Sequence, residues 1–167
     1  MMTNYTTLAD DTRVWVYQSN RQFSDAEKEQ ISETLTSFCH EWNAHGNPLH
    51  NYFEIRENRF IILMADESHL PASGCSIDSS TRVLKKLQQH LHLDFFDRTR
   101  IAFFMEGAVK TYSLNEIKIA LGNGTVGSAA ILFNTTVSTK KELEEAWKIP
   151  VEKSWLSKYL PEHTLSQ

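Results

Sequence analysis

The alternation of apolar and polar residues predicts four strands in the first two thirds of the chain. Residues 13–18 (RVWVYQ) and 100–105 (RIAFFM) are rich in the β-branched and aromatic residues that favour strands. Residues 51–56 alternate between apolar and polar side chains, which is typical of a strand with one buried face. Residues 60–65 contain no charge, and they predict a fully buried strand that a tight turn at Glu57-Asn58 joins to the preceding one.

Two segments have the spacing of amphipathic helices. The first follows a capping-box pattern from Ser24 to Glu27, and its apolar residues recur at Ile31, Leu35, Phe38 and Trp42. The second begins near Ser76 and places five residues on one side: Ile77, Thr81, Leu84, Leu87 and Leu91. Gly46 and Pro48 end the first helix.

The resulting order β-α-β-β-α-β predicts an α+β protein with a ferredoxin-like sheet, in which the first and third strands are central. We expect a single domain over residues 1–167, made of a loose lead-in (1–12), a ferredoxin-like core (13–106) and a C-terminal extension (107–167). The extension is expected to contain a short helix near residues 114–121, a strand at 131–134 and a helix at 139–148. Because two helices cover only one face of such a sheet, the extension or a second copy in a homodimer must cover the other.

Composition narrows the classes of function. A chain of 167 residues has the size of one domain, and a net charge of −4 argues against general nucleic-acid binding. The first eleven residues (MMTNYTTLADD) lack the basic and apolar regions of a signal peptide, and no segment has the roughly 20 apolar residues that span a bilayer. With only two cysteines, Cys39 and Cys75, we expect a cytoplasmic protein without disulfides.

The densest group of small polar and reactive side chains lies where the second helix begins. A helix N-terminus offers unpaired N–H groups and partial positive charge, so it attracts anions and stabilises thiolates. The sequence therefore predicts a site for a small anionic ligand or for a carboxylate of a protein partner. The ligand-binding candidates are Ser73, Gly74, Cys75, Ser76, Asp78, Ser79, Ser80 and Arg82.

Two further hypotheses concern the same segment. In a cysteine-dependent enzyme, Cys75 would be the nucleophile, His69 the base and Asp66 the group that orients the histidine. In a structural role, Ser76 would cap the helix, Asp78 would complement its dipole and Gly74 would supply a turn. A third hypothesis is a homodimeric structural subunit.

Metal and nucleotide motifs are incomplete, so we expect neither a metal nor a cofactor. His40 and His45 are five residues apart, whereas a zinc-protease helix needs a spacing of four to place two histidines on one face. Residues 122–128 (GNGTVGS) have the glycine spacing of a phosphate-binding loop but no lysine, and they precede a predicted strand rather than a helix.

Several segments carry a resemblance to a known family. SGCSIDSS at residues 73–80 is the most specific, and the others are RVWVYQSNR, HEWNAHG, RFIILMADE and FNTTVSTKKELEEAW. These segments resemble a family of short uncharacterised bacterial proteins, some of which are labelled ABC transporter ATPase. The resemblance implies no mechanism, and the label conflicts with the residues because the chain has no Gly-Lys-Ser/Thr motif.

Overall fold

The computed structural model describes residues 1–162, which form a mixed α+β structure of two compact units. Unit 1 contains residues 1–97 and 136–144, and unit 2 contains residues 98–135 and the chain from 145 onward. Among the described residues, no helix combines the length and the apolar character needed to cross a membrane. The candidate residues of the sequence analysis all belong to unit 1.

Unit 1 is built on an antiparallel sheet of three strands in the order β1-β5-β4. The strands are β1 (Arg13–Gln18), β4 (His50–Arg56) and β5 (Phe60–Asp66). The turn between β4 and β5 has positive φ at both Glu57 and Asn58, which matches the right-handed twist of the strands. The first six residues of β5 are buried, so the predicted hairpin and buried strand are confirmed.

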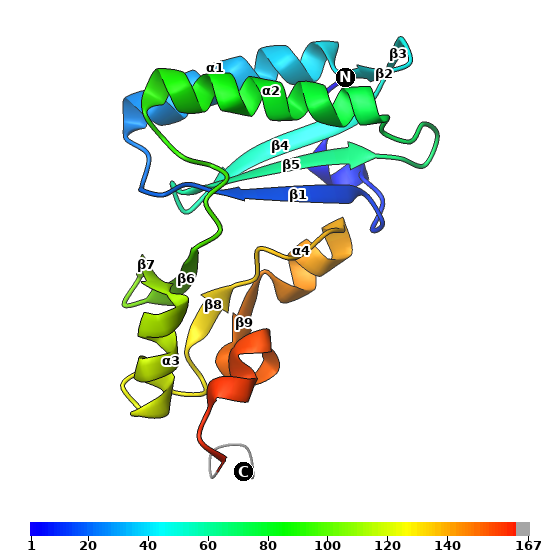
Figure 1. Ribbon diagram of the computed structural model, residues 1–167. Helices are drawn as coiled ribbons and strands as arrows, with labels where there is room; N and C mark the ends of the chain where they lie inside the picture. Colours follow the sequence, from blue (N-terminus) through cyan, green and yellow to red (C-terminus); the bar gives the residue numbers. More distant parts are fainter. Residues whose placement is uncertain (163–167) are drawn as a thin grey trace. The chain divides into compact units, whose positions relative to one another are not determined.

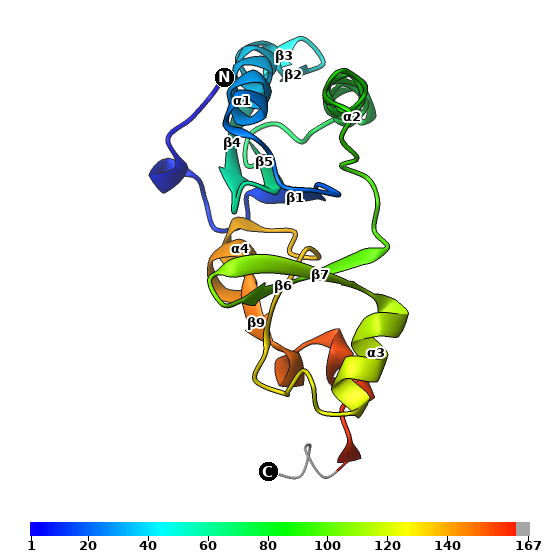
Figure 2. The same cartoon turned by 90° about the vertical axis from the view of Figure 1, so that its left-hand side faces the viewer.

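Helices α1 (Asp25–Glu41) and α2 (Gly74–Leu91) cover one face of this sheet (Figures 1 and 2). The capping box that begins α1 is confirmed: Ser24 and Glu27 accept each other's backbone N–H groups. The buried face of α2 differs from the predicted one, since it is formed by Ser76, Ser80, Leu84 and Leu87. Two serines therefore replace Ile77 and Thr81 on the buried face of the first half of α2.

A short hairpin connects α1 to β4. It consists of β2 (Asn43–Ala44) and β3 (Asn47–Pro48), with positive φ at His45 and Gly46 between them. The indole N–H of Trp42, just before this hairpin, donates a buried hydrogen bond to the Ser76 carbonyl at 2.9 Å. This bond fixes the end of α1 and the hairpin against the beginning of α2.

The lead-in is not loose, because it hydrogen-bonds along the edge of unit 1. Asn51 N–H donates to Met1 O, and Thr3 N–H donates to Asn51 O. Residues 136–144, which include most of α4 (Lys140–Ala146), also join unit 1: the Val14 N–H donates to Ser138 O at 2.9 Å. Lys140 is only 7% exposed and donates from Nζ to Leu8 O at 2.9 Å.

Unit 2 contains a second antiparallel sheet, in the order β7-β6-β8-β9. Its strands are β6 (Arg100–Met105), β7 (Ala108–Ser113), β8 (Ile131–Phe133) and β9 (Lys148–Pro150). Helix α3 (Leu114–Gly122) and the 3-10 helices Val151–Lys153 and Trp155–Tyr159 pack on its core, which includes Phe103, Ile117, Leu121, Leu132, Val151 and Leu156. The predicted short helix and the predicted strand near residue 131 are confirmed.

The ferredoxin-like arrangement is not confirmed, because the strand 100–105 does not pair with the strands of unit 1. This strand, β6, pairs with β7 and β8 instead. The turn at Glu106 and Gly107, both at positive φ, brings β7 directly back onto β6. The neighbouring strand β7 therefore pairs with β6 in place of the predicted partner β1, and β1 lies at an edge of its own sheet. The two units divide after residue 97, whereas the predicted core ended at residue 106.

The first prediction concerns the hydrogen bond that joins α1 to α2. Replacing Trp42 by Phe removes the N–H donor and leaves most of the ring in place. Trp15→Phe is the matched control, because the Trp15 ring is only half-buried and donates no hydrogen bond among the described residues. In urea unfolding, we expect Trp42→Phe to lose about 1 kcal/mol more free energy of unfolding than the control. Equal losses would show that this bond does not stabilise unit 1.

The second prediction concerns the beginning of α1. Two hydrogen bonds from the Arg21 guanidinium, at 2.9 and 2.8 Å, and one from the Ser24 N–H lower the pKa of Glu27 from 4.5 to about 2. A lowered pKa stabilises the fold above the ordinary pKa, and this stabilisation is lost as the pH falls toward the folded value. Between pH 4.5 and about 2, Glu27→Gln should therefore lose less stability than the wild type. The measurement is the melting temperature as a function of pH, and parallel profiles for the wild type and Glu27→Gln would contradict the prediction. Glu29→Gln, at an exposed position of the same helix, is the control and should follow the wild type.

Candidate functional site

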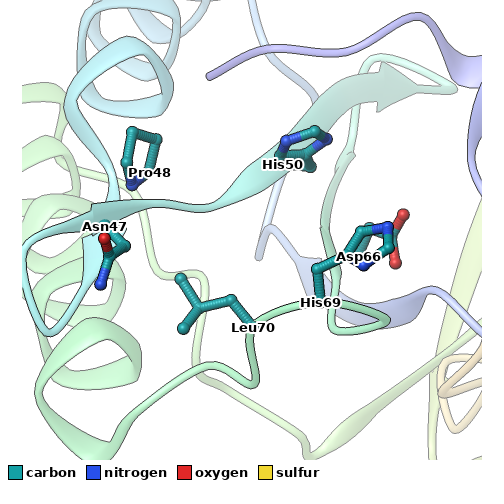
Figure 3. Close-up of a pocket in the computed structure, with 6 residues that line it drawn as sticks. All are labelled: Asn47, Pro48, His50, Asp66, His69 and Leu70. Atoms are coloured by element: carbon teal, nitrogen blue, oxygen red, sulfur yellow. The ribbon is translucent and has the colours of Figure 1, made fainter.

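Two hollows lie at the end of unit 1 where the β2–β3 hairpin meets the start of α2. The first, which we call the thiol hollow, measures about 300 Å³. The second, the histidine hollow, measures about 320 Å³ and is lined by Asn47, Pro48, His50, Asp66, His69 and Leu70 (Figure 3). The thiol hollow is lined by Phe38, Glu41, Trp42, Asn43, His45, Ser73, Cys75, Ser76 and Ser79. The hairpin contributes residues to both hollows.

The serines at the start of α2 hydrogen-bond to the backbone of their own helix. Ser73, rather than Ser76, is the N-cap, and its Oγ accepts the Ser76 N–H at 3.1 Å. The hydroxyl groups of Ser76, Ser79 and Ser80 each donate at 2.7 Å to the carbonyl three residues earlier. Such bonds are common for serines near helix starts. These three hydroxyl protons are therefore engaged, and the cap that the structural hypothesis assigned to Ser76 is formed by Ser73 instead.

Two N–H groups at this helix start are unpaired. The Ser76 and Ile77 N–H groups donate to Ser73, but those of Gly74 and Cys75 donate to no residue in the described part of the chain. They occupy the first two positions of the helix, which never have partners within it. A side chain added at Gly74 would meet no atom within 4 Å, so this start is open to ligands.

The Cys75 thiol is exposed and lines the thiol hollow, but its predicted partners lie elsewhere. His69 and Asp66 line the histidine hollow. The imidazole and the carboxylate that share the thiol hollow belong to His45 and Glu41. Four of the remaining candidates line neither hollow: Gly74, Asp78 and Arg82 are exposed, and Ser80 is buried.

Sequence reasoning missed His45 as a neighbour of Cys75. It treated His45 only with His40 and Glu41, as possible metal ligands on a helix that in fact ends at Glu41. The signal that could have found it is the dipeptide His45-Gly46: both residues adopt positive φ in a two-residue turn, a conformation that histidine tolerates better than most residues. The turn places this imidazole beside the start of α2.

In the histidine hollow, His50 begins β4 and lies opposite Asp66, the last residue of β5. His69 and Leu70 come from the loop after β5 (Figure 3). The Oδ1 atom of Asp66 accepts both the N–H and the hydroxyl of Ser68. These bonds, assisted by the nearby charges of His50 and His69, lower the pKa of Asp66 below its ordinary value.

Two other motifs weighed in the sequence analysis concern a metal site and a phosphate-binding loop. Within residues 1–162, no three histidine, cysteine, aspartate or glutamate side chains are placed to hold a metal ion. The glycine-rich segment 122–128 leads into β8, as predicted, and lines a hollow of about 200 Å³ in unit 2. It follows α3 rather than preceding a helix.

Comparisons of the chain with protein-family models, with curated proteins and with solved structures give no match. The resemblance carried by SGCSIDSS and the other segments therefore stays a prediction. The interpretation of the two hollows depends on their geometry.

The third prediction uses the two cysteines as reporters of this geometry. Cys39 is fully buried, and burial raises the pKa of its thiol to about 12, whereas Cys75 is exposed. A thiol reagent such as iodoacetamide should modify Cys75 in the folded protein and Cys39 only after unfolding. The measurement is intact-mass spectrometry with and without denaturant, with Cys75→Ser as the control that stays unmodified when folded. Protection of Cys75 until the chain unfolds would contradict an open thiol hollow.

Proposed function

We propose that the protein is a non-catalytic binding protein that holds a small anionic ligand in the thiol hollow. The observation that carries this proposal is a pair of N–H groups at the start of α2 that are unpaired among the described residues: that of Cys75, which lines the hollow, and that of Gly74, which directly precedes Cys75 but does not itself line the hollow. Helix N-termini recognise anions because such N–H groups point outward and the helix dipole favours negative charge. The exposed, unbonded thiol is in keeping with a reducing compartment such as the cytoplasm.

The rest of the hollow limits where the anionic group lies. Glu41 lines the hollow and repels anions, so the group binds on the side of α2 rather than on that of α1. The Phe38 and Trp42 rings, 5.2 Å apart, offer an apolar wall. The ligand expected from these features has one carboxylate or phosphate group and an apolar part.

The fourth prediction tests the N–H groups directly. Gly74 is the first residue of α2, where proline is well accommodated, and Ser73 before it has the extended conformation (φ −81°, ψ 163°) that proline requires of its predecessor. Gly74→Pro therefore removes one N–H donor without disturbing the helix, while Gly74→Ala keeps the donor. We expect the proline variant to bind a ligand from a panel of phosphate and carboxylate compounds about 10- to 100-fold more weakly, and the alanine variant to resemble the wild type.

The measurement is a thermal-shift screen with inorganic phosphate and small carboxylates, followed by calorimetry on any compound that stabilises the wild type. Without ligand, the proline variant should melt at or above the wild-type temperature, because proline restricts the unfolded chain. Absence of any stabilising anion contradicts the proposal. Equal affinity of the proline and alanine variants does so too, since it would place the anion elsewhere.

A second candidate is a cysteine-dependent enzyme, favoured by the presence of Cys75, His45 and Glu41 around one hollow. In this case His45, rather than His69, is the base that takes the thiol proton. Alkylation of Cys75 should then be faster in the folded protein than in the unfolded chain at the same pH, and His45→Ala should slow it. A rate equal to that of the unfolded chain, unchanged by His45→Ala, favours the binding protein.

A further inference from the structure

We propose that the histidine hollow is a second binding site, which takes a small primary ammonium compound with a short apolar tail. The site is separate from the thiol hollow and does not depend on the function proposed for it. The hollow brings together an aspartate and two histidines from three different parts of unit 1, none of which engages the others in a hydrogen bond given by the structure. Figure 3 shows His50, Asp66 and His69 in one part of the hollow and Asn47, Pro48 and Leu70 in the other.

Several polar atoms of this hollow have no partner among the described residues. Asp66 Oδ1 is occupied by Ser68, but Oδ2 accepts no hydrogen bond from the described residues. The ring nitrogens of His50 and His69 likewise form no hydrogen bond within residues 1–162. A neutral imidazole offers one acceptor nitrogen and one N–H donor, and an ionised carboxylate oxygen is an acceptor. A primary ammonium has three N–H donors and no acceptor, so it matches the free carboxylate oxygen and the acceptor nitrogen of each ring.

The charge of the hollow also favours a cation. The hydrogen bonds from Ser68 lower the pKa of Asp66, so its carboxylate is ionised at neutral pH. The adjacent Glu67 is paired with Arg13 of β1 at 3.3 Å, so these two charges offset each other. Unit 1 as a whole carries sixteen acidic and ten basic residues, an excess that attracts cations.

The remaining lining residues limit the shape of the ligand. Pro48 and Leu70 present apolar surface, and Asn47 borders the hollow from the β2–β3 hairpin. A volume of about 320 Å³ accommodates a compound of a few carbon atoms. The ammonium group of an alkylammonium ion can donate to the acceptors, and its alkyl chain can pack against Pro48 and Leu70.

The test is an NMR titration of the histidine ring resonances with n-butylammonium chloride. Butyltrimethylammonium is the matched probe, because it has the same charge and tail but no N–H donor, and butyrate is the anionic control. We expect the His50 and His69 resonances to shift with n-butylammonium, and the quaternary ion to bind about tenfold more weakly. Equal binding of both cations overturns the proposal, as does the absence of shifts in these two residues.

Variants give an independent measurement. Asp66→Asn keeps an oxygen that can accept the Ser68 N–H but removes the charge, and it should weaken n-butylammonium binding about tenfold. Glu33→Gln removes one acidic charge from an exposed position of α1 outside the hollow and should leave this binding unchanged. If Asp66→Asn binds as the wild type does, the hollow is not the site.

Discussion

The buried hydrogen bond from the Trp42 indole to the Ser76 carbonyl organises the end of unit 1 that carries the two hollows. It joins the residue after α1 to the first turn of α2, and it holds the β2–β3 hairpin between them. Because Ser76 is small and buried, the two helices approach closely enough for this bond to form. Both hollows lie beside this contact, because the β2–β3 hairpin contributes lining residues to each of them.

The serines of the segment SGCSIDSS (residues 73–80) have a different role from Cys75 within it. Ser76, Ser79 and Ser80 donate their hydroxyl protons to backbone carbonyls in the first turns of α2, and Ser73 Oγ accepts the Ser76 N–H, so these side chains fix the helix start. The N–H groups of Gly74 and Cys75 remain open because the first N–H groups of any helix have no partner within it.

The two hollows differ in electrostatic character although they share the hairpin. The thiol hollow includes the positive end of a helix dipole, with one carboxylate opposite. The histidine hollow includes a carboxylate whose ionised form is stabilised by Ser68, flanked by two imidazoles. An anionic group suits the first and a cationic group suits the second. This contrast arises from the direction of α2 and from the register that places His50 opposite Asp66.

The sequence alone determined the local elements of this protein, because their signals come from neighbouring residues. The capping box at Ser24, the turn at Glu57-Asn58 and the uncharged strand at residue 60 all form as the pattern predicts. Only the tertiary structure decided which strands pair and which side chains meet. The strand at residue 100 pairs with β7 and β8 in unit 2, because a tight turn supplies a nearer partner than β1. His45, rather than His69, joins Cys75 in one hollow because the conformation of the hairpin, and not distance along the chain, sets where an imidazole lies.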